Sequence, residues 1–239
     1  MVCLPEIPEW LKGKSTVNAV PEDASSSVND NSVFITELTE TLSAGDTQVK
    51  ISLSDGRSFF TRLIYFNLDI GDFYSFFSQG SVFSEDMLNE LYIAVRRYFA
   101  ECKALDYLNR AEQSRFMLER KLSGKEFLTE EFSPALDFLQ EKGYLDDSRF
   151  AASWLRARIR LKPEGKIKLK AGLYKKGISR QTAEAVLSDF FDDVDEADLC
   201  RRALQKQVGH NQCEQKLIRS MLRKGFSYSV IMQCLAENE

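Results

Sequence analysis

Two adjacent carboxylates, Asp146 and Asp147, are the first candidates for chemistry in this 239-residue chain. They lie in the stretch GYLDDSRFAASW, between an apolar run and a basic one. Paired carboxylates can act in acid–base catalysis or bind a metal ion, but that work needs a complementary group, and no histidine lies near them in the sequence. The alternative is that Gly143 ends one helix and Asp146 or Asp147 caps the next, where negative charge is favourable. We expect the capping role.

A dense block of cations follows these carboxylates. From position 148 to position 180 the chain carries eleven Lys and Arg residues against Glu164 alone, a local charge of +10. The whole chain has a net charge of −4, so the remainder carries −14. On a helix with roughly 100° between residues, Arg149, Arg156 and Arg160 fall within about 40° of one another and form a ridge.

Such a ridge predicts an anionic partner, either nucleic-acid phosphates or an acidic protein surface. No regular series of aromatic residues interleaves with the cations, so we expect contact with single-stranded or double-stranded DNA through its backbone rather than base stacking. The residues expected to contact DNA or a protein partner are Arg149, Arg156, Arg160, Lys162, Lys166, Lys168, Lys170, Lys175 and Lys176, with a smaller cluster of Arg219, Arg223 and Lys224.

One arginine does not follow the ridge. Arg158 falls on the helix face that carries Phe150 and Trp154, which we expect to be core residues together with Tyr144. Its guanidinium either extends along the apolar surface to solvent or pairs with a carboxylate such as Asp146 or its neighbour. The sequence leaves both open.

Other chemistry has little support in the sequence. His210 is the only histidine, and the five cysteines are scattered without a close pair, so neither a zinc site nor a disulfide framework is expected. No phosphate-binding loop, dinucleotide fingerprint or nucleophile elbow is present. We therefore expect no catalytic residue, no metal ion and no cofactor. Without a long apolar run or a signal peptide, we expect a cytoplasmic protein that does not contact a membrane.

The N-terminal quarter predicts a tail followed by strands. Residues 1–31 contain Pro21 and three consecutive serines with few periodic apolar positions, so we expect a disordered tail. Residues 32–83 alternate Val-, Ile-, Thr- and Phe-rich runs with turn signals. The pair Asp55-Gly56 between two such runs is typical of a two-residue type I′ hairpin turn. We expect a small antiparallel module of three strands.

The rest of the chain is helical and repetitive. Apolar residues spaced i, i+4, i+9 occur three times, about 50 residues apart, which predicts three-helix units. Gly177 and Gly225 stand where a helix ends in the left-handed conformation. We expect a mainly α fold: a linking helix over 84–101, then repeats over 102–145, 146–193 and 194–239 that form an elongated curved solenoid. The spaced residues are Leu118, Leu122 and Phe127; Leu169, Leu173 and Ile178; and Leu217, Met221 and Phe226.

The string GYLDDSRFAASWLRARIRLKPEGKIKLKAGLYKKGIS, with SRFMLERKL before it and KLIRSMLRKGFSYSVI after it, resembles the RecX family of recombinase regulators. The resemblance spans roughly residues 33 to 237. It implies three tandem three-helix repeats and a protein that binds the RecA-type recombinase filament on DNA, usually restraining its ATPase and strand-exchange activity. The first repeat departs from this pattern. It reads Lys125-Glu126-Phe127 where the later repeats read Lys-Gly-Ile and Lys-Gly-Phe, so the sequence does not decide whether its helix ends in the same conformation.

Three functional hypotheses remain. The first is a monomeric, non-enzymatic regulator, most simply an inhibitor, of a RecA-type recombinase in homologous recombination, DNA repair and the SOS response. The second is a sequence-independent nucleic-acid-binding helical-repeat protein without a recombinase partner. The third is a helical-repeat adaptor for acidic proteins, which would have no affinity for DNA.

Overall fold

The computed structural model describes residues 34–82, 84–206 and 214–237. The predicted fold class is confirmed, because the described residues are mainly helical and include a small antiparallel sheet. The expected tail over 1–31 lies outside the described residues. Two compact units are present: Met1–Ala104 with Glu126–Phe138, and Leu105–Lys125 with Leu139–Glu239. The domain boundaries expected from the sequence stay predictions.

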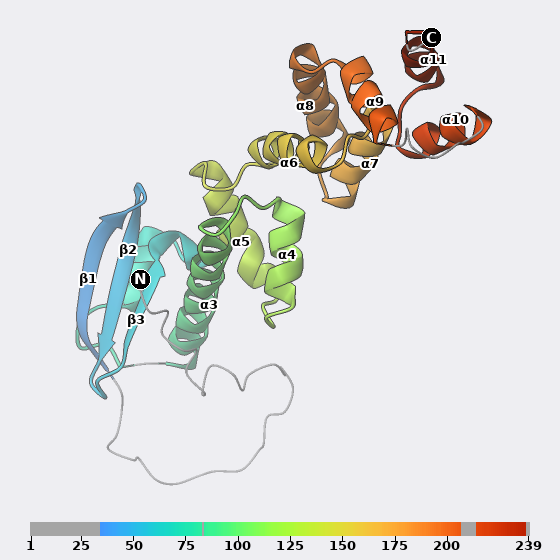
Figure 1. Cartoon of the computed structure of the whole chain (residues 1–239). Helices are drawn as coiled ribbons and strands as arrows, with labels where there is room; N and C mark the ends of the chain where they lie inside the picture. Colours follow the sequence, from blue (N-terminus) through green and yellow to red (C-terminus); the bar gives the residue numbers. More distant parts are fainter. Residues whose placement is uncertain (1–33, 83, 207–213, 238–239) are drawn as a thin grey trace. The chain divides into compact units, whose positions relative to one another are not determined.

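The sheet in the first unit has the order β1-β2-β3, formed by β1 (Ile35–Ser43), β2 (Asp46–Leu53) and β3 (Ser58–Arg62) (Figure 1). Its β1–β2 loop is Ala44-Gly45, with φ of 56° and 71°, as a type I′ turn requires. The expectation of that turn at Asp55-Gly56 was wrong. Gly56 alone has positive φ there, and the Asp55 carboxylate instead accepts hydrogen bonds from the backbone N–H and side chain of Arg57.

The sheet packs on α3 (Glu85–Leu108), and the short helices η1 (Leu63–Tyr65) and α2 (Ile70–Phe76) lie between them in sequence. The Arg62 guanidinium at the end of β3 forms a buried ion pair of 2.7 Å with Glu101 of α3. The Tyr65 hydroxyl donates to the same carboxylate at 2.7 Å. Burial and the Glu101 charge raise the pKa of Tyr65 well above its usual value. These polar contacts fix the register of α3 on the sheet.

Two further helices follow, α4 (Arg115–Ser123) and α5 (Thr129–Glu141). Pro134 inside α5 has no N–H for the carbonyl of Glu130, and that carbonyl accepts from Arg97 instead, at 3.4 Å. Glu126, between α4 and α5, adopts φ of 63°, so the left-handed conformation is kept where the glycine is missing.

The remaining helices form two groups in the second unit. The second helix group comprises α6 (Asp147–Leu161), α7 (Lys166–Lys175) and α8 (Arg180–Asp193), and the third comprises α9 (Glu196–Gln205), α10 (Glu214–Arg223) and α11 (Tyr228–Ala236) (Figure 1). Each group has its own apolar core, and Ile159 packs against both cores. The residues with i, i+4, i+9 spacing are buried, except Leu217, which is half-buried.

Candidate functional site

The adjacent carboxylates are structural. The Asp146 side chain is the N-cap of α6, accepting from the backbone N–H groups of Ser148 and Arg149 at 2.7 and 3.0 Å. The Asp147 carboxylate accepts from the backbone N–H of Arg115, the first residue of α4, at 2.8 Å. Each carboxylate therefore satisfies the start of a helix, Asp146 its own and Asp147 that of a neighbour. They are not arranged as a catalytic pair.

Three glycines end helices as the sequence predicts. Gly143, Gly177 and Gly225 have φ of 74°, 78° and 87°. After α7 the N–H of Ile178 bonds to the carbonyl of Leu173, the six-residue closure that follows a left-handed glycine. Phe226 bonds to Met221 in the same way after α10.

The turn after α7 contacts the segment that precedes α4, and the turn after α10 contacts the segment that precedes α7. We call these contacts the first and the second junction. At the first junction, the Ser114 hydroxyl before α4 donates to the carbonyl of Lys176 at 2.6 Å, and a β carbon on Gly177 would collide with Phe116. At the second junction, the N–H of Gly165 before α7 donates to the carbonyl of Lys224 at 3.0 Å. The same arrangement is thus used twice, one repeat apart.

Several cations of the basic block are held by carboxylates of the chain. Arg149 donates to Glu112 at 2.6 Å and to the carbonyls of Gly143 and Tyr144, so its guanidinium secures the start of α6. Lys170 pairs with Glu184, as does Arg180. Tyr144 is 46% exposed, so the expectation that it lies in the core was wrong, whereas Phe150 is buried.

Other cations of the block remain available to a partner. Among the described residues, no hydrogen bond or ion pair ends on the side-chain nitrogens of the exposed residues Arg156, Arg160, Lys162 and Lys175. Lys166 is exposed and lies over the Phe191 ring, at 5.5 Å from its centroid. Lys176 is half-buried, and Arg219 and Arg223 are exposed on α10. We call Arg156 and Arg160 the α6 ridge.

The alternatives left open for Arg158 are resolved by a third carboxylate. Its guanidinium makes two bonds to Glu164, at 2.7 and 3.0 Å, and none to Asp146 or Asp147. Lys168 approaches Glu164 at 3.0 Å. Burial opposes ionisation of Glu164, but the hydrogen bonds from these two cations outweigh it and lower its pKa.

Glu164 lies in a hollow of about 300 Å³ at the second junction, which we call the junction pocket. Lys206 reaches the pocket from the end of α9 and was not predicted from the sequence. No spacing signal could have found it, because it lies outside the basic block. The lining residues are Arg158, Leu161, Lys162, Pro163, Glu164, Lys168, Lys206 and Lys224.

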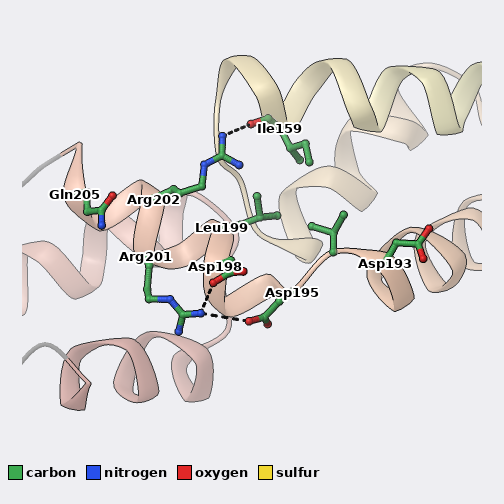
Figure 2. A pocket seen from close by; sticks show the side chains of 9 residues that line it. Ile159, Asp193, Asp195, Asp198, Leu199, Arg201, Arg202 and Gln205 are labelled. Carbon is green, nitrogen blue, oxygen red and sulfur yellow. Dashed lines mark hydrogen bonds and ion pairs between the residues drawn. The ribbon is translucent and has the colours of Figure 1, made fainter.

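A second hollow, of about 470 Å³, lies between α6 and α9 and has a different character. Figure 2 shows the Arg201 guanidinium bound to Asp195 and Asp198, and Arg202 directed to the carbonyl of Ile159. Its cations are therefore already paired with carboxylates or a carbonyl. Asp193 adds a third carboxylate to the lining, so this hollow does not suit an anion.

The described part of the chain offers little support for a reactive cysteine, a metal site or a membrane-spanning helix. Burial raises the pKa of the Cys200 thiol to about 12, so this cysteine is not a poised nucleophile. Within residues 34–82, 84–206 and 214–237, no cluster of His, Cys, Asp and Glu side chains is placed to hold a metal ion. None of the described helices combines the length and apolarity that a membrane crossing requires.

Comparison with known proteins places this arrangement in a family. Residues 146–187 match the family model described as "RecX, second three-helix domain", which begins at the N-cap of α6. A crystal structure of a regulatory protein RecX superposes with a TM-score of 0.67, covering 87% of this chain and all of that one at 23% identity, which shows the fold.

Sequence relatives extend the match. The regulatory protein RecX of Clostridioides difficile (strain 630) is 29% identical over 203 residues, covering 80% of this chain and 89% of that protein. The regulatory protein RecX of Treponema pallidum (strain Nichols) is 33% identical over 153 residues, which is 64% of this chain and 93% of that protein. At that identity and coverage, the chain belongs to the RecX family of regulatory proteins.

Proposed function

We propose that this protein is a non-enzymatic regulator of a RecA-type recombinase that binds the recombinase–DNA filament and restrains ATP hydrolysis and strand exchange. The observation that carries the proposal is membership of a family of regulatory proteins, together with the cations of α6 and α7 that have no partner among the described residues. Exposed arginines and lysines of this kind suit DNA phosphates or acidic protein surface.

The α6 ridge is the part of this surface best suited to contact. Arg156 and Arg160 lie four residues apart, so they project from the same side of α6 one turn apart. Both are exposed, and they point away from the buried residues Ala151 and Leu155. In this proposal they hold the protein on the filament, and the bound protein hinders subunit movement by occupying space.

The test uses the full-length protein with the recombinase of the same organism on single-stranded DNA. ATP hydrolysis should fall in proportion to bound regulator, because steric restraint is stoichiometric. Charge reversal of the ridge, Arg156→Glu with Arg160→Glu, should weaken filament binding by at least about 10-fold, since two contacts turn repulsive. Lys125→Glu with Arg110→Glu is the matched control, because both residues are exposed and neither lies on α6, α7 or α10.

Three results would contradict the proposal. Hydrolysis that is unchanged at saturating regulator excludes restraint of the recombinase. Equal losses in the ridge variant and the control exclude a specific role for the ridge. A collapsed far-ultraviolet circular dichroism spectrum in the ridge variant would assign these arginines to the fold instead.

Nucleic-acid binding without a recombinase partner is the second candidate function, favoured by the same exposed cations. Its signature is tight binding to bare DNA that falls steeply with salt, with no change in recombinase activity. The hydrolysis assay and a DNA titration in the absence of recombinase separate the two candidates.

A further inference from the structure

We propose that the junction pocket is a binding site for a phosphate group, supplied by the backbone of a nucleic acid or by a free polyphosphate. The pocket is lined by five cationic side chains and one carboxylate, a formal excess of four positive charges in a hollow of about 300 Å³. With a backbone phosphate as occupant, the inference rests on the proposed function and extends it to one defined site.

The single carboxylate does not neutralise the pocket. Glu164 is buried and binds both Arg158 and Lys168, which orders two of the cations. Among the described residues, no hydrogen bond or ion pair ends on the ammonium groups of Lys162 and Lys206. The excess charge is therefore carried by side chains that the described part of the chain leaves without a counterion.

Lys224 adds a half-buried cation to this group. Its ammonium contacts the carbonyl of Ala203 at 3.4 Å, which is long for a charged donor. Burial, followed by repulsion from Lys168 and Lys206, lowers its pKa. An anion in the pocket would offset that repulsion and stabilise the charged form of Lys224.

Three of the charged residues at the second junction have uncharged counterparts at the first. At the first junction the Ser114 hydroxyl donates to the carbonyl of Lys176, where Gly165 uses its backbone N–H at the second. The residues 51 positions before Lys162, Glu164 and Lys168 are Ala111, Gln113 and Met117. Gln113 is buried like Glu164, but accepts from Lys121 alone, at 2.9 Å. The first junction thus carries Lys121 and Lys176, but it lacks counterparts of the charged residues Lys162, Glu164 and Lys168.

A phosphate group fits the chemistry of the pocket better than a carboxylate does. Several ammonium groups and one guanidinium converge from α6, the α6–α7 loop, α7, α9 and the turn after α10. A phosphate offers oxygens in several directions, whereas a carboxylate offers two in one plane. Since the lining comes from both the second and the third helix groups, an occupant would also bind these groups together.

The test compares Lys162→Gln with Lys206→Gln against the control Lys125→Gln with Arg110→Gln. Both pairs remove two exposed charges, and only the first pair lines the pocket. Binding of a fluorescein-labelled oligothymidylate is measured by anisotropy over a range of salt concentrations, without recombinase. Inorganic pyrophosphate is titrated separately into each protein by calorimetry. Lys224→Gln serves as a second variant inside the pocket, and thermal melting checks the fold of all variants.

For a backbone phosphate, we expect the pocket variant to lose about 10-fold in DNA affinity and to show a salt slope smaller by about 0.7, the change for one phosphate on a single strand. The control should change by less than about twofold. For a free polyphosphate, pyrophosphate binding should disappear in the pocket variant while DNA binding stays. Equal losses in the pocket and control variants, or no loss of either ligand, would overturn the proposal. Because recombinase is absent, this result stands apart from the hydrolysis assay.

Discussion

Adjacent residues of the same type have different roles in this chain. Asp146 caps α6, and Asp147 caps the start of α4 in the preceding part of the chain. Glu196 repeats the second role one repeat later, since its carboxylate accepts from the backbone N–H of Lys166 at 2.8 Å. The local cap was predictable from the order of glycine and aspartate. The contact across the junction was not, because it joins positions 32 residues apart.

The residue that adopts the left-handed conformation after α4, α7 and α10 is a second feature at the residue scale. Gly177 and Gly225 adopt it without strain, whereas Glu126 has a β carbon and φ of 63°. The Arg96 guanidinium donates to the Glu126 carbonyl at 2.9 Å, so tertiary contact holds the backbone there. The sequence could not predict this, because the conformation is imposed by a residue 30 positions away.

Replacing this residue by glycine should stabilise the protein. In Glu126→Gly the steric cost of the left-handed conformation, about 1–2 kcal/mol, is relieved and is partly offset by the greater freedom of glycine in the unfolded chain. We expect a gain of about 0.5–1 kcal/mol in the free energy of unfolding, measured by urea denaturation. Glu126→Ala is the control, since it removes the side chain and keeps the strain. A glycine variant no more stable than the alanine variant would contradict this account.

At the scale of elements, the sheet is tied to α3 by buried charge. Arg62 and Glu101 are almost fully buried, and Tyr65 donates to the same carboxylate. The guanidinium also lies 4.4 Å from the centroid of the Phe138 ring. Runs rich in Val, Ile, Thr and Phe predicted the strands. This ion pair was missed, because neither charged residue stands in a motif and their contact depends on the register of α3.

Removing the acid from this pair should be costly. Glu101→Gln leaves the Arg62 guanidinium buried without a counterion, so we expect a loss of about 3–5 kcal/mol in the free energy of unfolding. Urea denaturation followed by circular dichroism measures it. Glu37→Gln on the exposed face of β1 is the control and should cost less than about 0.5 kcal/mol. A loss in Glu101→Gln as small as in the control would mean that solvent reaches the pair.

At the scale of the whole molecule, some cations pair with carboxylates of the chain, whereas others are exposed and have no such partner among the described residues. The basic block stood out in the sequence, but counting charges could not separate Arg149, held by Glu112, from Arg156, which has no such partner among the described residues. Nor could it place Lys206 in the junction pocket. Composition thus predicted the sign of the partner's charge, and the fold selects which cations are available to meet it.

The α6 ridge and the junction pocket should contribute independently to DNA binding. The two sets share no residue, because Arg156 and Arg160 do not line the pocket. If each surface holds a different phosphate of one strand, the losses in binding free energy from Arg156→Gln with Arg160→Gln and from Lys162→Gln with Lys206→Gln should add within about 0.5 kcal/mol. The quadruple variant should then show the sum of the two reductions in salt slope. Anisotropy titrations of the four proteins over a range of salt concentrations complete the cycle. A quadruple variant that binds DNA as well as either pair alone would show that both sets of cations serve one phosphate, because removing either set would already have lost that contact.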